Sequence, residues 1–577
     1  MKLKTYFPFL DWISSYQRSW LKNDILAGIT IGVMLIPQGI AYATIAGLPP
    51  IYGLYTAMIP QLVYAFLGTS RQLSVGPAAM DSLIVASGIS AIAVVGSEHF
   101  IFMSILLAFF VGFFQILFGV FKLGFLVNFL SRPVISGFTS GSAIIIASNQ
   151  IGNLLGTNIP RSNHIQTLVK SVISGFEDIQ LLTSVIGVVS IIILFLFKKF
   201  IPRIPASLVV VVLGILVVYF FKMNNSGISI IGELPKGLPK FNVPEINKQN
   251  FNELSSLALT LALIGFMEAI SIAKTIEVKH NNYKVSPNQE LIALGFGNLI
   301  GSFFQTFPAT AGFARTAVND QSGAKTPLSS FFAAIVIALT LLFLTPLFYF
   351  LPKTVLAAII IVAAFGLLDF AMPKKLLFYN KRDLLILNIT LLITIFFGIK
   401  EGILTGIVLS LVMLIYKSTK PHIAVLGNVP NTHFYRNKER FKDVFTQDDI
   451  LIVRFDAQLH FANTTFFKDR ITDLVVKKGN KLKFLIIDGE SINGLDSSAI
   501  YAIDEIHDKI SEKGVEIAFT GLKGPVRDAM VKSGLMKKIK YDHCFMSIQE
   551  AIDYYKKKSS KDKKKYSYQE YIKQVNR

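Results

Sequence analysis

Long apolar stretches are the feature that most restricts how this chain can fold. Residues 100–121 and 179–197 contain no charged side chain, and each matches the roughly 20 residues that a helix needs to cross a bilayer. Two shorter apolar stretches, near 74–94 and 308–320, begin with proline and small residues. The remaining stretches, broken by glycine, proline or single charges, lie at about 24–46, 51–69, 133–155, 204–221, 254–276, 287–306, 326–350, 354–370, 382–399 and 401–416. About fourteen such segments predict a polytopic α-helical membrane protein.

Charge divides the 577-residue chain into unlike parts. The chain has 57 basic and 37 acidic residues. Residues 1–420 contain 29 basic and 16 acidic residues, and the tail 556–577 contains 9 basic and 2 acidic residues. Residues 421–555 therefore hold 19 of each, so the net charge of +20 lies outside them and does not indicate a nucleic-acid partner. We expect a membrane domain at 1–420, a soluble domain with a preceding linker at 421–555, and a basic tail that is solvated or meets anionic lipid headgroups.

Basic residues in the short loops predict the orientation in the membrane. If the N-terminus is cytoplasmic, every loop from an even-numbered to an odd-numbered segment carries lysine or arginine, and the opposite short loops are nearly bare of them. An even number of segments then places both termini in the cytoplasm, in a multi-pass protein of the inner (plasma) membrane. The basic residues are Arg71, Lys122, Arg132, Lys198, Lys199, Arg203, Lys279, Lys284, Lys325, Lys374, Lys375, Lys381 and Arg382.

Two interrupted segments indicate an internal repeat. Pro77 and Pro308, which stand in the breaks at 74–79 and 307–312, are 231 residues apart, and the polar residues Gln38 and Glu268 are 230 apart. Seven segments in each half make the halves inverted, so the helix starts at the two breaks would face each other and offer free N–H groups to an anion. Glycine and proline that serve only helix packing are the alternative reading.

Several motifs recur together in one known family. They are Pro49–Ala57, Leu67–Arg71, Ser74–Pro77, Pro37–Tyr42, Asn288–Leu291, Gly301–Phe304 and Arg315–Thr316. The set resembles the signature of the SulP family of sulfate permeases and inorganic anion transporters, over nearly the whole chain. The resemblance implies a seven-plus-seven inverted repeat with core and gate domains, a cytoplasmic STAS domain and a homodimer.

The resemblance also implies where the anion binds, between the third and tenth segments. Gln38 and Tyr42 would line the pocket, and Arg315 matches a basic residue that follows the start of the tenth segment in many members. Some members have serine where this chain has Ala314, so the resemblance leaves the preferred anion open. The backbone N–H donors would come from Ala78, Ala79, Met80, Ala311, Gly312, Phe313 and Ala314.

Glu268 is the acidic residue that the sequence places deepest in an apolar segment. A carboxylate there costs several kcal/mol unless it is paired, protonated or bound to an ion. We expect it to carry the coupling cation, a proton in preference to sodium, because no second acidic residue stands beside it on that segment. A structural ion pair with Arg315 or Lys274 is the alternative. Asp81, early in the third segment, could bond helix donors, face water or join the coupling site.

Residues 449–533 predict an alternating β/α module. Strands are expected at 449–455, 482–488 and 515–520, and helices at 463–477, 497–512 and 525–533. The order of elements and the loop 488–498 resemble the STAS domain, which implies a possible protein partner. Ser497 matches a serine that is phosphorylated in related domains, although Asp496 and its neighbours also form a helix N-cap.

The sequence therefore predicts secondary active transport of an inorganic anion, sulfate first, coupled to protons through Glu268. A bicarbonate transporter, possibly sodium-driven, is the nearest alternative. An uncoupled anion channel or exchanger and a membrane-tethered regulatory protein are the others. No catalytic triad, metal-ligand spacing or cofactor motif is present, so we expect neither an enzyme nor a bound cofactor.

Overall fold

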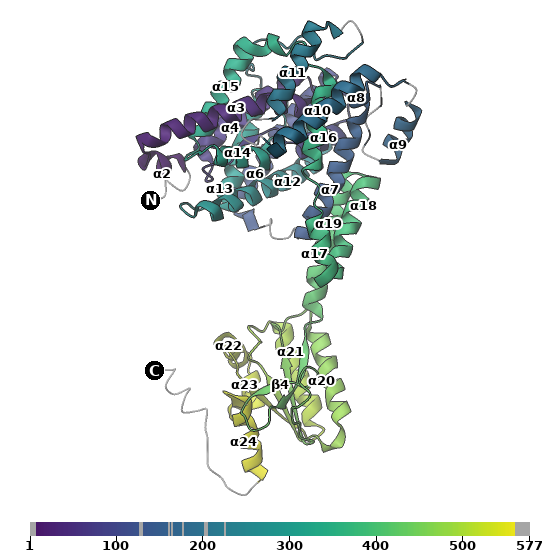
Figure 1. Ribbon diagram of the computed structural model, residues 1–577. Coiled ribbons are helices and arrows are strands. Elements are labelled where there is room, and N and C mark those ends of the chain that lie inside the picture. Colours follow the sequence, from purple (N-terminus) through teal and green to yellow (C-terminus); the bar gives the residue numbers. More distant parts are fainter. Residues whose placement is uncertain are drawn as a thin grey trace. The chain divides into compact units, whose positions relative to one another are not determined.

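The computed structural model of the protein describes residues 7–125, 131–157, 159, 162, 165–175, 178–200, 206–223 and 227–559. Arg203 and the tail beyond residue 559 lie outside these ranges. The chain forms two compact units, Met1–Ser410 and Leu411–Arg577, and each is described by itself. Figure 1 follows the chain through both units.

The first unit is helical, and each predicted apolar segment contains one of its helices. Those helices are α3 (Arg18–Ala46), α4 (Pro50–Leu67), α5 (Ala79–Ile89), α6 (Glu98–Val120), α7 (Arg132–Asn149), α10 (Leu181–Phe200), α11 (Ala206–Phe220), α12 (Lys248–His280), α13 (Pro287–Ser302), α14 (Phe313–Gln321), α15 (Leu328–Leu339), α16 (Lys353–Phe365), α18 (Lys381–Phe397) and α19 (Ile399–Thr419). Shorter helices stand between them: α2 (Phe9–Ser14), α8 (Ile151–Leu155), α9 (Ile165–Ser174) and α17 (Ala371–Tyr379).

Five of the described helical segments are long and apolar enough, by length and composition, to cross a membrane. They are Arg18–Ala46, Glu98–Val120, Lys248–His280, Leu328–Phe348 and Glu401–Thr419. The segment from Leu328 reaches this length because α15 continues through a π turn and a 3₁₀ turn. Several other apolar helices are shorter, among them α5, which follows the first predicted break. The short helix α14, which is largely polar, follows the second break.

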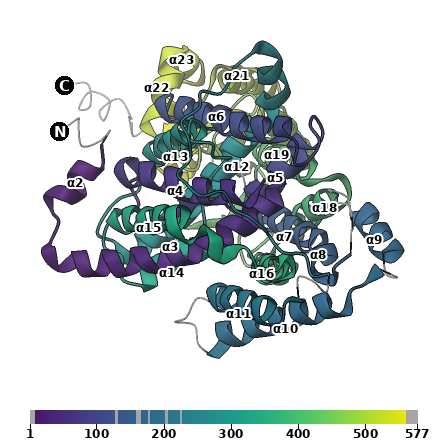
Figure 2. The same cartoon turned by 90° about the horizontal axis from the view of Figure 1, so that it is seen from above.

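Small residues let these helices pack closely. A side chain at Gly112 of α6 would place its Cβ 2.6 Å from the carbonyl oxygen of Gly295 on α13, so these two backbones touch only because both positions are glycine. The pairs α3 with α15 and α7 with α18 also pack together. Figure 2 shows α10 and α11 side by side at the margin of the helical unit.

The second unit is built on one six-stranded sheet with the order β4-β3-β5-β6-β7-β8. Its strands from β5 onward are parallel, whereas β3 and β4 are antiparallel to their neighbours. The strands are β3 (Ile423–Asn428), β4 (Tyr435–Asn437), β5 (Ile450–Phe455), β6 (Phe484–Asp488), β7 (Glu516–Thr520) and β8 (Cys544–Phe545). The helices are α20 (Thr464–Lys478), α21 (Ser497–Ser511), α22 (Gly524–Lys532), α23 (Leu535–Ile539) and α24 (Ile548–Ser559).

The central strands could be predicted from the sequence because the sheet is buried on both faces, which makes these strands largely apolar. All five residues of β6 are buried, as is typical of a parallel strand covered on both sides. One face packs mainly against α20, α21 and α22, and the other face packs against α24. The expected strands and helices at 449–533 are all present. The stretch that was expected to be a linker before this module contains β3 and β4, which belong to the same sheet.

Candidate functional site

The two breaks that the sequence singled out lie against each other. Strand β1 (Val75–Gly76) pairs antiparallel with β2 (Thr310–Ala311), with Val75 opposite Ala311 and Gly76 opposite Thr310. The N–H of Gly312 donates to the carbonyl of Ser74 at 3.1 Å. Because each short strand leads directly into a helix, the pairing holds the starts of α5 and α14 at one crossing point.

Neither helix start is capped by a side chain. The N-cap residues are Ala78 for α5 and Gly312 for α14, and neither has a side chain that could accept from the first turn. The first N–H groups of an α-helix have no partner within the helix, and each start carries about half a positive charge. Two open starts at one crossing are suited to hold an anion through backbone donors.

Arg315 links the two helix starts. Its side chain is 2% exposed, and its Nη1 donates to the carbonyl of Pro77 at 2.8 Å. Its Nε and Nη2 are buried without a hydrogen-bond partner. A Cβ at Gly312 would lie 2.6 Å from Cζ of Arg315, so glycine at that position leaves the space that the guanidinium fills. Two buried donors therefore remain for an acceptor.

Two acidic side chains lie in the electrostatic surroundings of Arg315. Glu268 comes from α12 and Asp81 from the first turn of α5. One oxygen of each, Oε2 of Glu268 and Oδ1 of Asp81, is buried without a hydrogen-bond partner. Lys274, the other proposed partner of Glu268, bonds instead to Glu277 at 2.6 Å and to the carbonyl of Val285. The site thus combines unpartnered donors with unpartnered acceptors.

Helix α3 contributes the two polar residues expected from the first segment. Gln38 and Tyr42 are four residues apart on one face of α3, and each is 8% exposed. Oε1 of Gln38 is buried without a partner, and Tyr42 lies within electrostatic range of Arg315 and Glu268. Helix α3 packs against both α5 and α14.

The expected backbone donors differ in their surroundings. Ala78 and Met80 are buried, and Ala79 and Gly312 are partly buried. Phe313 and Ala314 at the start of α14 are exposed, although Arg315 next to them is buried. Ala311 belongs to β2 and is paired with Val75, so it forms part of the crossing and precedes the helix start.

Sequence reasoning missed the residues that hold the second break in place. The side-chain oxygen of Asn298 accepts from the N–H of Ala309 at 2.8 Å, and its nitrogen donates to the carbonyl of Ala309 at 3.0 Å. The hydroxyl of Thr310 donates to the carbonyl of Gly265 at 2.6 Å, which ties β2 to α12. An asparagine within an apolar segment was the available signal.

A further buried acid, Glu290 at the start of α13, is fully bonded. Its carboxylate accepts from the hydroxyl of Tyr64 at 2.7 Å, from the N–H and hydroxyl of Thr69 at 2.7 and 2.5 Å, and from the N–H of Ser70 at 3.3 Å. The side chain is completely buried. It joins α13 to the end of α4, and both of its oxygens have hydrogen-bond partners.

In the second unit, the loop before α21 contains the expected helix cap. Asp496 accepts from the N–H of Ala499 at 2.8 Å, and its other oxygen accepts from the N–H of Phe461 at 2.8 Å. Ser497 is the first residue of α21 and is exposed. Burial raises the pKa of Asp488, at the start of the same loop, above its usual range.

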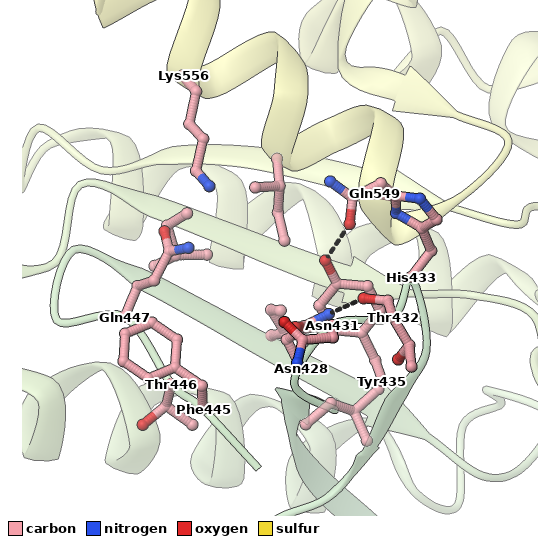
Figure 3. A pocket seen from close by; sticks show the side chains of 14 residues that line it. Asn428, Asn431, Thr432, His433, Tyr435, Phe445, Thr446, Gln447, Gln549 and Lys556 are labelled. Atoms are coloured by element: carbon pink, nitrogen blue, oxygen red, sulfur yellow. Dashed lines mark hydrogen bonds between the residues drawn. The ribbon is translucent and has the colours of Figure 1, made fainter.

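A cavity of about 430 Å³ lies on the α24 side of the same sheet (Figure 3). Asn428, Tyr435 and Gln549 stand at its rim, where the hydroxyl of Tyr435 donates to Oε1 of Gln549 at 2.6 Å. Sequence reasoning did not find it, because its lining comes from two separate parts of the chain. The lining residues are Leu426, Asn428, Asn431, Thr432, His433, Tyr435, Phe445, Thr446, Gln447, Ile450, Ile452, Gln549, Ile552 and Lys556.

Comparison with known proteins accounts for both units. The model of the Sulfate permease family matches residues 21–390, and that of the STAS domain matches residues 442–551. The chain is 39% identical to Sulfate transporter 4.1, chloroplastic, of Arabidopsis thaliana, over 95% of this chain and 82% of that protein.

Solved structures show the same fold. The murine Slc26a9 anion transporter in its inward-facing state matches with a TM-score of 0.89 at 25% identity, over 96% of this chain and 94% of that one. The transmembrane domain of the cyanobacterium bicarbonate transporter BicA matches with a TM-score of 0.60 at 23% identity, over 68% of this chain and 98% of that domain. The predicted fold class, a helical membrane unit followed by an α/β STAS domain, is confirmed.

Proposed function

Because this chain belongs to the sulfate permease family and carries a STAS domain, we propose that it moves sulfate across its membrane by alternating access, coupled to protons through Glu268. The chain is a membrane-spanning anion transporter and not an enzyme. The substrate, the coupling ion and the working cycle are the parts that this proposal adds.

The observation that carries the proposal is the set of unpartnered donors at the crossing of β1 and β2. Nε and Nη2 of Arg315 have no hydrogen-bond partner, and no side chain caps the starts of α5 and α14. A tetrahedral oxyanion has only acceptor oxygens and can meet donors from several directions at once. Burial makes each unmet donor costly, so an anion in this position stabilises the site as well as binding to it.

The starts of α5 and α14 would move with the bound anion as one body. Asn298, Thr310 and Arg315 tie the two breaks to each other, to α13 and to α12. The site would therefore stay assembled while this body shifts against the remaining helices and opens first to one side of the membrane and then to the other.

Glu268 would supply the coupling. In its ionised form it repels the incoming anion and attracts Arg315, whereas a proton on Glu268 removes the repulsion and frees Arg315 for the substrate. Sulfate and a proton would then bind and leave together. The alternative in which Glu268 serves only as an ion-pair partner predicts transport that ignores the pH gradient.

The remaining parts of the proposal concern assembly and location. We expect a homodimer in the inner (plasma) membrane with both termini in the cytoplasm, and a possible protein partner at the STAS domain. The orientation is expected from the basic residues in the short loops, and the homodimer and the STAS partner are expected from the family. Ser497 is exposed at the start of α21 and is therefore accessible to a kinase.

Bicarbonate is the second candidate substrate. Ala314 offers no hydroxyl at the open start of α14, so the site has fewer donors than a serine there would give. A smaller donor set suits a monoanion better than a dianion. The two substrates also differ in the charge that must be balanced in the site.

Uptake of labelled sulfate and bicarbonate into proteoliposomes tests the proposal. Purified full-length protein is reconstituted and given an imposed pH gradient, a sodium gradient or neither. The proposal expects concentrative sulfate uptake driven by the pH gradient, with little bicarbonate uptake. Sodium-driven bicarbonate uptake would replace it with the second candidate. Flux that ignores both gradients would indicate a channel or exchanger, and no flux of any anion would indicate a regulatory role.

A further inference from the structure

Asp81 stands where a second negative charge is least expected. It is the third residue of α5, so its carboxylate lies at one of the two helix starts that we assign to the anion. The side chain is 2% exposed and makes no capping bond, and its Oδ1 is buried without a partner. A permanently ionised carboxylate in this position would compete with the substrate for the same donors.

Asp81 also lies against the helix that carries Glu268. A Cβ at Gly265, one turn before Glu268 on α12, would be 3.6 Å from Oδ2 of Asp81 and 3.3 Å from the hydroxyl oxygen of Thr310. The charged groups that act on Asp81 are Glu268 from α12 and Arg315 from α14, and Arg315 in turn is close to Tyr42 from α3. Two carboxylates and one guanidinium therefore share a single buried environment.

The charges of this environment balance for a dianion only when both carboxylates are neutral. Arg315 contributes one positive charge, and the two helix starts contribute about half a charge each. Together these offset the two negative charges of sulfate. Each ionised carboxylate adds one uncompensated negative charge, which is expensive in a buried site. If only Glu268 is protonated, the ionised Asp81 therefore leaves the sulfate-loaded site with one excess negative charge.

We propose that Asp81 is a second proton-carrying residue of the transport cycle, so that Asp81 and Glu268 together take up two protons with each sulfate. Each carboxylate gains one proton on the side where the anion binds and loses it on the side where the anion leaves. The loaded carrier then has no net transported charge. This inference rests on the proposed sulfate transport and specifies its proton stoichiometry.

The balance point of flux in proteoliposomes tests the stoichiometry. The imposed sulfate gradient is varied at a fixed pH difference, with the membrane potential clamped at zero, until net sulfate flux stops. For each coupled proton, a difference of one pH unit changes the sulfate concentration ratio at which net flux stops by about tenfold. The wild-type protein should balance a sulfate gradient of about 100-fold per pH unit, and changing the membrane potential should not move this balance point.

Asp81→Asn should lower the balance point to about tenfold per pH unit and make it depend on membrane potential, because one negative charge then crosses in each cycle. Asp81→Glu should restore two-proton coupling. Ser82→Ala, which changes the adjacent buried polar residue, should behave as the wild type.

An Asp81→Asn variant that retains the balance of about 100-fold per pH unit would overturn the inference. A tenfold, voltage-dependent balance in the wild type would also overturn it, even if no variant at position 81 could be purified. A balance point set by sodium in place of protons would overturn it as well. A wild type that moves no sulfate under any gradient would instead contradict the proposed function.

Discussion

Two glutamates in the membrane unit, the buried Glu290 and the partly buried Glu268, show how differently the same side chain is used. Glu290 accepts hydrogen bonds from Tyr64, Thr69 and Ser70 at both of its oxygens. Glu268 leaves Oε2 buried and unbonded in the neighbourhood of Arg315. A saturated acid fixes the fold, whereas an unsaturated one keeps its capacity for a proton or an ion.

The aspartates of the same unit divide in the same way. Asp24 is completely buried and accepts from the N–H groups of Lys325 and Thr326 at 2.7 and 3.1 Å and from the Thr326 hydroxyl at 2.6 Å. Asp81 is equally hidden but leaves Oδ1 without a partner. The unsatisfied acids share one site with Arg315, and the satisfied acids join helices elsewhere. Substitutions at these residues test whether this division separates structural from functional side chains.

The largest effect on stability is expected from Glu290→Ala. The substitution leaves the donors of Tyr64, Thr69 and Ser70 without an acceptor, which should lower the free energy of unfolding by about 3–5 kcal/mol. Thermal unfolding of purified protein in detergent measures the change. Glu268→Gln is the matched control and should alter stability by less than about 1 kcal/mol. Equal losses in both variants would remove the distinction between the two acids.

Arg315→Ala should weaken sulfate binding by about 10- to 100-fold, because two charge-assisted hydrogen bonds disappear. Equilibrium binding of labelled sulfate to the purified protein measures the loss. The variant should remain folded, since Nη1 makes only one bond, to Pro77. Unchanged sulfate affinity in a folded variant would place the anion elsewhere.

Glu268→Gln should lower the sulfate gradient that one pH unit sustains from about 100-fold to about tenfold, the part that Asp81 carries, while exchange of labelled for unlabelled sulfate persists. Glutamine keeps the size of the side chain and its hydrogen-bonding capacity but cannot gain or lose the coupling proton. Parallel uptake and exchange assays in proteoliposomes separate the two activities. An unchanged gradient of about 100-fold per pH unit in this variant would show that Glu268 carries no coupling proton.

Gly312→Ala should weaken sulfate binding by about tenfold or less. The new Cβ would lie 2.6 Å from Cζ of Arg315 and would force the guanidinium from its position at the crossing, at an expected cost of about 1 kcal/mol. Ala314→Ser, two residues further along, adds a hydroxyl at an exposed position and should not weaken sulfate binding. Competition with bicarbonate would show whether that hydroxyl improves the preference for sulfate.

The smallest effect on stability is expected in the STAS domain, where the hydrogen-bonded acid Asp496 is only partly buried. Asp496→Ala removes the cap of α21 and should destabilise that helix by about 1 kcal/mol. Ser497→Ala leaves the cap intact and should have no measurable effect on the helix. Hydrogen exchange of α21 peptides in the full-length protein compares the two. Faster exchange in the serine variant alone would contradict the assignment of the cap to Asp496.

The helices and strands could be predicted from the sequence where a single signal, such as the length of an apolar stretch, dominated. Apolar length located the helical segments, and buried apolar runs such as β6 located the central strands of the STAS domain. The paired positions of Pro77 and Pro308 also pointed to the two breaks that meet in the structure. Family resemblance selected the residues proposed to bind the anion, whereas Glu268 was selected as an acid within an apolar segment.

Long-range contacts were beyond the reach of the sequence. Proton coupling was preferred over sodium because no second acid stands beside Glu268 on its own segment, yet Asp81 enters the same environment from α5. The bonds from Asn298 to both backbone groups of Ala309 depend on a sharp reversal of the chain. Strand β3 (Ile423–Asn428) is a short run that starts with four apolar residues, and β4 (Tyr435–Asn437) has only three residues, so neither shows a clear alternation.

The position of a bound anion tests the central claim most directly. Selenate has the shape and charge of sulfate and contains a heavy atom that anomalous X-ray scattering can locate. The account predicts a selenium peak at the crossing of β1 and β2, with selenate oxygens within hydrogen-bond distance of Arg315 and of N–H groups at the starts of α5 and α14. A peak that touches neither Arg315 nor these two helix starts would contradict it.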